Sequence, residues 1–264
     1  MSDTVLIRFL HHMACSGGSI ISRCLAAMPD VALLSEIHPD MGMQARANPL
    51  KQAQRAYSLV SREQLHQQFA GQIGTILNNA TAQNMRLVLR DHLHADFIGH
   101  GEFRHSAVEC LSSLAPAIRC ATVRHPIDVW LGLQHNNWLE WTIPQYCARL
   151  VHVARSARDT GFVRYEEFTL NPSVAIERLC SMLDLPFDPH FLHNLDRVTH
   201  ITGASGRQEL PISPRPRRQC EQHIIDTFDT CPAYHEVLDI LGYSHPDAYS
   251  LSIDSQHVGV STRS

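Results

Sequence analysis

The sequence predicts an α/β fold, a three-layer sandwich in which a mainly parallel sheet lies between two layers of helices. Short apolar runs recur along the chain, and they alternate with longer segments whose apolar residues return every three or four positions. The short runs are typical of buried strands, and the longer segments are typical of helices with one buried face. Strands that alternate with helices favour a parallel sheet, because each helix returns the chain to the edge where the next strand begins.

The chain opens with a strand, a loop, a helix and a second strand. Residues 4–10 are apolar and β-branched enough for a buried strand, and the small residues of 11–19 predict a loop. Apolar residues then recur at helical spacing over 21–28, and Pro29 ends that helix. The apolar run 31–34 predicts the second strand.

The middle of the chain continues this alternation. A short helix is expected over 52–59, in a region of mixed composition. Ser61 and Gln64 form a capping-box pattern, and the four-residue spacing of the following apolar residues predicts a helix over 62–80. Next come the third strand at 86–90, a helix at 106–114 and the fourth strand at 118–123.

Proline marks the start of two later helices. Pro126 suits a first helical turn, where its missing N–H costs nothing, so a helix is expected from there through Trp138. Asn171 followed by Pro172 is a typical N-cap and first helical position. The remaining helices are expected at 143–157, 172–183, 219–229 and 233–241, with a short fifth strand at 162–167. The glycine, proline and arginine residues of 203–218 predict a mobile basic loop.

Length and composition limit the class of protein. The 264 residues allow one large domain, expected over 1–246, with a polar and disordered tail at 247–264. The net charge of −4 gives no general attraction to nucleic acid or to an anionic membrane. No apolar run approaches the roughly 20 residues of a membrane span, and the N-terminus lacks a signal-peptide pattern, so we expect a cytoplasmic protein. The eight cysteines include no CxxC pair and no HExxH occurs, so we expect no metal site.

The first loop has the composition of an anion-binding turn. Gly17 and Gly18 allow several backbone N–H groups to face one point, and the helix that follows directs its positive end there. A tight turn without a ligand explains the same residues. The fingerprints GxGxxG and GxxxxGK[ST] are absent, which disfavours ordinary dehydrogenases and ATPases.

Polar residues follow the second, third and fourth strands. Glu36, His92 and Arg124 each come just after a strand, and the carboxyl ends of parallel strands meet at the edge where α/β sheets bind ligands. His92 is suited to be a general base, because a histidine pKa lies near 6.5. A solvated carboxylate, a solvated loop histidine and a surface salt bridge would explain the same three residues.

Taken in order, five stretches resemble the motifs of sulfotransferases that use 3′-phosphoadenosine 5′-phosphosulfate (PAPS) as the sulfuryl donor. The resemblance covers about residues 4–220. Its motifs are the phosphosulfate loop P-[KR]-[ST]-G-[GTS]-[ST] at 14–19, K-x-H-L at 90–93, R-[ND]-P-x-D at 124–128, Y-E-[DE] at 165–167 and a basic glycine loop at 205–207. The resemblance implies the P-loop-like sulfotransferase fold.

The resemblance also implies roles for individual residues. His92 would take the proton of the acceptor, and Arg90 would stabilise charge near the sulfuryl group. Arg124 would hold the 3′-phosphate, and Tyr165 would lie against the adenine. The implied donor-binding residues are Cys15, Ser16, Gly17, Gly18, Ser19, Ile20, Arg124, Tyr165 and Arg207. No metal is implied.

Two residues depart from the family pattern. Cys15 stands where the family has lysine or arginine, and Gly132 stands where it has a serine that contacts the 3′-phosphate. The sequence therefore predicts either a sulfotransferase acting on a hydroxyl or amine of an unidentified small molecule or glycan, or a protein that binds the nucleotide with little or no turnover. A small-molecule kinase is the third alternative. Either His92 or Glu36 could be the base, and the oligomeric state is left open.

Overall fold

A parallel sheet of five strands forms the centre of the molecule. The computed structural model describes residues 5–40, 49–99, 101–203, 210–214 and 216–246. The strands are β1 (Ile7–His12), β2 (Val31–Ile37), β3 (Arg86–Asp91), β4 (Ala117–Val123) and β5 (Phe162–Arg164). Their order across the sheet is β2-β3-β1-β4-β5, and every neighbouring pair is parallel. The predicted fold class is confirmed.

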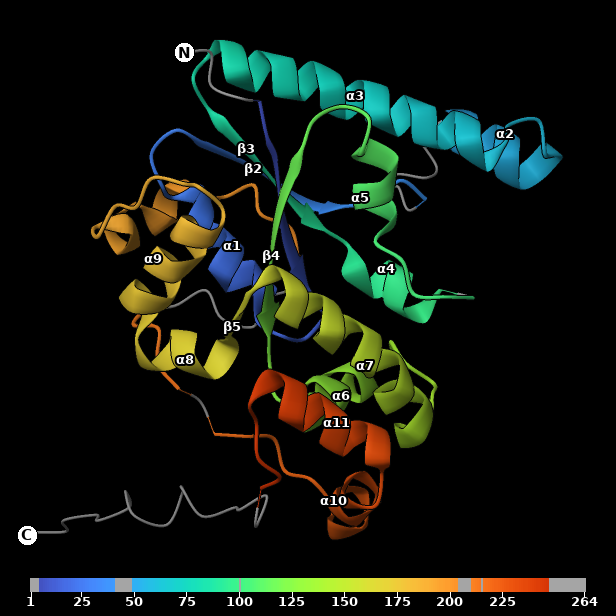
Figure 1. Ribbon diagram of the computed structural model, residues 1–264, viewed down its shortest axis with the longest axis vertical. Coiled ribbons are helices and arrows are strands. Elements are labelled where there is room, and N and C mark those ends of the chain that lie inside the picture. The colour runs from blue at the N-terminus through green and yellow to red at the C-terminus, as the bar shows by residue number, and fades with distance from the viewer. Residues whose placement is uncertain (1–4, 41–48, 100, 204–209, 215, 247–264) are drawn as a thin grey trace, which may run out of the picture.

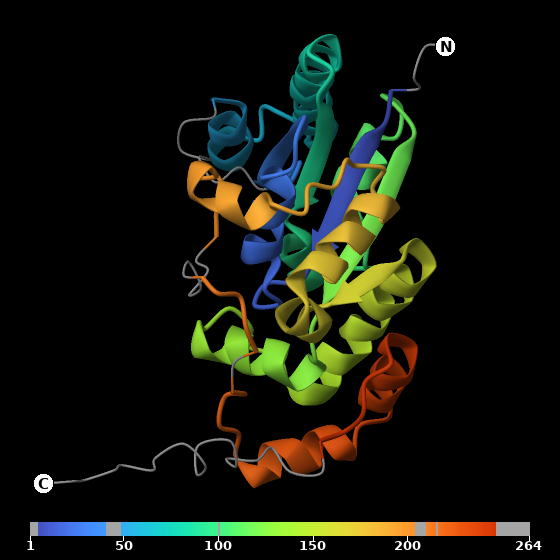
Figure 2. The same ribbon diagram turned by 90° about the vertical axis from the view of Figure 1, so that its left-hand side faces the viewer.

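Helices cover both faces of the sheet (Figures 1 and 2). One face packs against α1 (Gly18–Ala26), α9 (Pro172–Met182) and the 3-10 helix η1 (Phe191–Arg197), through side chains such as Leu10 and Val88. The other face packs against α3 (Arg62–Ala82) and α5 (Ser106–Leu111) through Phe9 and Leu89. Each strand therefore contributes alternate residues to two separate cores, as its two-residue side-chain period requires.

A third core extends beyond the carboxyl end of the sheet. It joins α6 (Pro126–His135) and α7 (Ile143–Thr160) to α10 (Gln222–Asp229) and α11 (Pro232–Leu241). Figures 1 and 2 show α10 and α11 together at one end of the molecule. The remaining helices are α2 (Pro49–Tyr57), α4 (Leu93–Ile98) and α8 (Tyr165–Leu170). Within the described ranges, no helix is both long and apolar enough to cross a bilayer.

The expected fifth strand is too long. Residues 165–167 were predicted to continue it, but the strand ends at Arg164 and the chain turns at once into α8. Glu166 and Glu167 lie in the first helical turn, where the helix dipole favours acidic side chains. Glu167 also accepts a hydrogen bond from the guanidinium of Arg164 at 2.8 Å, which holds the N-cap.

Besides α8, two short helices and some boundaries were not predicted. Within the described residues, α4 and η1 are additions, while the helices expected to reach residues 114 and 138 end at Leu111 and His135. Helix α4 is stabilised by Arg149 of α7, whose guanidinium donates to the carbonyl oxygens of Asp96 and Phe97. A contact of this kind joins residues about fifty positions apart, so no local pattern reveals it. The expected tail at 247–264 lies outside the described residues.

The capping box of α3 offers a test of the local folding signals. The Ser61 side chain accepts from the N–H of Gln64 at 3.2 Å, and the Gln64 side chain accepts from the N–H of Ser61 at 2.8 Å. We expect Ser61→Ala to lower the free energy of unfolding by about 1 kcal/mol, measured by urea denaturation. Gln72→Ala, at an exposed position of the same helix, is the control. Equal stability of the two variants would contradict the capping role.

Candidate active site

The loop between β1 and α1 is a tight turn that directs backbone amides toward one point. The Ser16 side chain donates to the Met13 carbonyl oxygen at 2.6 Å, which closes the turn. Gly17, the N-cap of α1, has φ of 87°, in the left-handed region that favours glycine. Among the described residues no side chain caps the amino end of α1. The first amides of this nine-residue helix therefore point toward the space above the loop, where an anion would be stabilised.

Two aromatic rings enclose the loop. The ring of His12 packs against Gly18, and the ring of Tyr165 packs against Gly17, so closely that a Cβ atom on either glycine would overlap the ring. Burial lowers the pKa of His12 to about 3, so the ring that supports the loop is neutral. Both glycines are thus required by space, and Gly17 is required by its backbone conformation as well.

Arg124 lies beside this loop. It follows β4 directly, and its guanidinium donates to the Cys15 carbonyl oxygen at 3.2 Å. Its Cζ atom lies 4.9 Å from the centre of the Tyr165 ring, within range of a cation–π contact. The structure therefore brings Arg124, Tyr165 and the loop together, as expected for one ligand site.

Glu166 fixes the corner that carries Arg124. One of its carboxylate oxygens accepts from the backbone N–H of His125 at 3.0 Å, and the other accepts from the Tyr243 hydroxyl at 2.7 Å. The first turn of α6 is thereby tied to the segment after α11. Glu166 therefore has a structural role, because it holds two segments of the chain together.

Arg90 forms a buried ion pair at the other side of the loop. Its side chain is fully buried, and its Nη2 atom lies 2.6 Å from Oε1 of Glu36. Glu36 reaches it from an irregularity at the end of β2, where its own φ is 54°. Arg90 also donates to the Thr202 carbonyl oxygen at 3.0 Å. A non-glycine residue with positive φ at such a place is a strained feature of the kind found at functional sites.

The segment after η1 crosses this ion pair. A Cβ atom on Gly203 would lie 2.6 Å from Oγ of Ser19, 3.0 Å from Glu36 and 3.1 Å from Arg90. Ser19, Arg90 and Glu36 therefore meet at one point beneath Gly203. The loop that begins at Gly203 was expected to reach the site through its basic residues. Its passage over the Glu36–Arg90 pair was not predicted, because that position depends on contacts with β2 and β3 that are distant in the chain.

His92 stands at the N-cap of α4, next to Arg90. Its backbone N–H donates to the Ile37 carbonyl oxygen at 2.9 Å, which ties the end of β3 to the end of β2. Burial lowers the pKa of His92 below its usual 6.5, although the nearby Glu36 charge opposes the shift. The imidazole is therefore neutral at pH 7 and can accept a proton.

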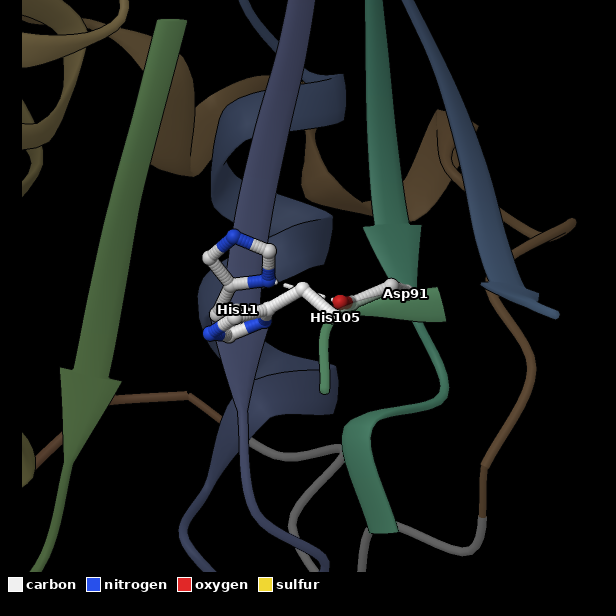
Figure 3. A group of neighbouring side chains, drawn as sticks. All are labelled: His11, Asp91 and His105. Atoms are coloured by element: carbon white, nitrogen blue, oxygen red, sulfur yellow. Dashed lines mark hydrogen bonds and ion pairs between the residues drawn. The ribbon is translucent and has the colours of Figure 1, made fainter. Parts of the chain in front are cut away.

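A cluster of three side chains lies on the face of the sheet opposite α1 (Figure 3). His11, Asp91 and His105 bring possible metal-ligating atoms within 4.8 Å of one another. However, His11 Nδ1 lies 2.6 Å from Asp91 Oδ2, and Arg119 Nε donates to His11 Nε2 at 3.0 Å. Because both ring nitrogens of His11 are engaged, the cluster fits a hydrogen-bonded network better than a metal centre.

Comparison with known proteins identifies the fold. No protein family model matches the chain, and neither does any curated protein. The sulfotransferase domain from the Synechococcus PCC 7002 olefin synthase aligns with a TM-score of 0.56 at 17% identity, over 93% of this chain and 98% of that one. The sulfotransferase domain from the curacin biosynthetic pathway aligns with a TM-score of 0.53 at 16% identity, over 91% and 98%. The chain has the sulfotransferase fold.

A third solved structure is more distant. Mouse sulfotransferase SULT7A1, complexed with PAP, aligns with a TM-score of 0.37 at 12% identity, over 72% of this chain and 62% of that one.

On this sulfotransferase fold, the two departures from the family motifs are in contact. A Cβ atom on Gly132 would lie 2.6 Å from Cβ and 3.0 Å from Sγ of Cys15. The Cys15 side chain therefore lies against α6, with φ of 65° at its own backbone. Burial raises the pKa of this thiol. The serine of the family motif would overlap Cys15, so the two substitutions form one matched pair.

The basic loop approaches the candidate site through residues other than the expected one. Arg207 lies outside the described residues. Arg217 lies 3.5 Å from a carboxylate oxygen of Asp128, on the helix that follows Arg124. The positive charge of Arg218 opposes the rise that burial causes in the pKa of the Cys15 thiol. Positive charge from the C-terminal part of the loop thus gathers beside Arg124.

The matched pair can be tested by a double-mutant cycle. Gly132→Ser should lower the free energy of unfolding by about 1 to 3 kcal/mol, because the new side chain overlaps Cys15. Adding Cys15→Gly should recover most of this loss, since glycine removes the overlap and tolerates the positive φ. Urea denaturation of the four proteins measures the coupling. Strictly additive effects would contradict the contact.

Proposed function

We propose that the protein is a sulfotransferase that uses PAPS as its donor. The observation that carries the proposal is the meeting of the glycine loop, Arg124, Arg90 and His92 at the carboxyl edge of one parallel sheet. The edge supplies an anion site, two cations and a neutral base. The sulfotransferase domains with this fold support the same assignment.

The donor would be held mainly by the loop. The amides of residues 16–20 and the Ser19 hydroxyl would bind the phosphosulfate, with the helix dipole of α1 in support. The Ser16 hydroxyl would join them by turning away from the Met13 carbonyl oxygen. Arg124 would turn from the Cys15 carbonyl to the 3′-phosphate, and the Tyr165 ring beside it would border the adenine. Arg217 and Arg218 would supply further positive charge.

The transfer itself needs a base and charge stabilisation. His92 would accept the proton as the acceptor oxygen or nitrogen attacks sulfur. A new bond forms from the acceptor to sulfur, the bond from sulfur to the phosphate oxygen breaks, and PAP leaves with the electron pair. Arg90 would stabilise the negative charge that spreads over the sulfuryl oxygens. This cation would replace the one that the family motif places at Cys15.

We prefer His92 to Glu36 as the base. An oxygen of Glu36 lies 2.6 Å from the buried guanidinium of Arg90, so it is paired with a permanent cation. The imidazole of His92 is neutral and only half buried. Glu36 would then hold Arg90 in place, and an acceptor hydroxyl or amine of a small molecule or glycan would approach His92.

One observation favours the second candidate, a nucleotide-binding protein with little turnover. Gly203 lies directly over Ser19, Glu36 and Arg90, where the sulfuryl group would have to fit. Binding of PAP without transfer to any acceptor would favour this candidate. Magnesium-dependent turnover of ATP would instead support a kinase.

Nucleotide binding can be measured by calorimetric titration with PAP, beside ATP with magnesium as a control ligand. Arg124→Ala should weaken PAP binding by about 1.5 to 3 kcal/mol, or roughly 10- to 150-fold in Kd, because a charge-assisted phosphate contact is lost. Arg155→Ala, which removes an exposed pair with Glu236, is the matched control and should bind as wild type does. Unchanged affinity in Arg124→Ala would show that the 3′-phosphate site is assigned wrongly.

The pH dependence of turnover tests the base. Because the pKa of His92 is lowered, its neutral form predominates at pH 7 and is lost as the pH falls through that lowered value. We expect the acidic limb of kcat/KM to have its midpoint below pH 6.5, the ordinary histidine value, and to be absent in His92→Gln. An acidic limb that persists in the variant would assign the titration to another group.

A further inference from the structure

A row of three polar side chains crosses the sheet beneath the site (Figure 3 shows two of them, with His105). Asp91 of β3, His11 of β1 and Arg119 of β4 occupy three neighbouring strands, on the face that packs against α5 and α7. Asp91 and His11 are 1% and 2% exposed. His11 Nδ1 lies 2.6 Å from Asp91 Oδ2, and Arg119 Nε lies 3.0 Å from His11 Nε2.

The hydrogen-bond partners define the state of the His11 ring. A guanidinium only donates, so His11 Nε2 must accept and carries no proton. The single ring hydrogen of a neutral imidazole then lies on Nδ1 and is donated to the Asp91 carboxylate. A protonated ring would direct an N–H at the guanidinium. The row is therefore a carboxylate, a neutral imidazole and a guanidinium, with its charges balanced.

The position of Asp91 in the chain links the row to the candidate site. It lies between Arg90 and His92 in the chain, and side chains alternate between the faces of a strand. When His11 holds Asp91 on one face, Arg90 is directed to the other, where it meets Glu36 and Thr202. His92 follows at the N-cap of α4, so its direction also depends on how β3 ends.

We propose that His11 is a positioning residue, which holds Asp91 and thereby aligns Arg90 and His92 for the reaction. This role rests on the proposed sulfuryl transfer, in which those two residues act directly. The decisive contact is the one from His11 Nδ1 to Asp91. The contact from Arg119 sets the tautomer that makes it possible.

Two substitutions separate the contacts. In His11→Asn the side-chain amide occupies the place of Nδ1 and can still donate to Asp91. In His11→Gln the amide oxygen occupies the place of Nε2 and can accept from Arg119, while the donor to Asp91 is lost. Each variant loses one buried hydrogen bond, so the two serve as controls for each other in thermal unfolding.

The proposal predicts different effects of these variants on the site. We expect kcat to fall about 10- to 100-fold in His11→Gln and to stay within about 3-fold of wild type in His11→Asn, because small displacements of reacting groups are costly. The KM for PAPS should change little in either variant. Equal losses of kcat in both variants would show a general structural role and overturn the proposal.

Histidine ring NMR provides a test that does not depend on activity. With the His92 signal assigned from the His92→Gln spectrum, we expect it to shift in His11→Gln and to keep its wild-type position in His11→Asn. An unchanged His92 signal in His11→Gln would overturn the proposal. If wild type neither binds PAP nor turns over, the proposed function fails, and this NMR comparison still decides the positioning of His92.

A measurement on the wild-type protein tests the proposal even if the variants do not fold. A long-range proton–nitrogen NMR spectrum should show His11 as the neutral Nδ1–H tautomer at pH 7, with a slowly exchanging ring proton. An Nε2–H tautomer or an imidazolium would be incompatible with the row and would overturn the proposal.

Discussion

The packing of two aromatic rings against Gly17 and Gly18 is the constraint on which the rest of the site depends. His12 supports the loop from the sheet side, and Tyr165 closes it from the side of α8. The two rings hold the backbone of Gly17 and Gly18 between them, and this fixes the direction of the first amides of α1. Arg124 then packs on the Tyr165 ring and on the Cys15 carbonyl, so the cation is placed by the same contacts that hold the loop.

At the end of β3, successive residues form charge pairs on opposite faces of the sheet. On the α1 face, the Arg90 charge is paired with Glu36 near the space where a ligand would bind. On the opposite face, the buried Asp91 is linked through the buried His11 to Arg119, which is partly exposed. A buried charge is tolerated only when it is paired and hydrogen-bonded, so each partner is needed where it stands. Three consecutive residues, 90–92, thus combine a paired cation, a structural carboxylate and a neutral imidazole.

The sequence predicted most of the architecture, and it predicted which candidate site residues lie at the same edge of the sheet. The alternation of apolar runs with helical spacing predicted the parallel sheet, and the loop, Arg90, His92 and Arg124 lie at one edge as expected. The prediction from local patterns failed where a contact with a residue distant in the chain determines the structure. Residues 165–167 read as a strand because Phe162 and Val163 precede them, yet the first-turn carboxylates and the contact with Tyr243 make them a helix start.

The sequence by itself determined the order of strands and helices along the chain and the residue types that follow the carboxyl end of each strand. Both depend on hydrophobic periodicity and helix capping, which are local properties. What the tertiary structure decided is which of these residues share a contact. Cys15 and Gly132 read as two separate losses, but they fit together because β1 and β4 are adjacent and bring the loop against α6. The pairing of Glu36 with Arg90 likewise required the sheet, since the two residues are distant in the chain and meet only where β2 and β3 end side by side.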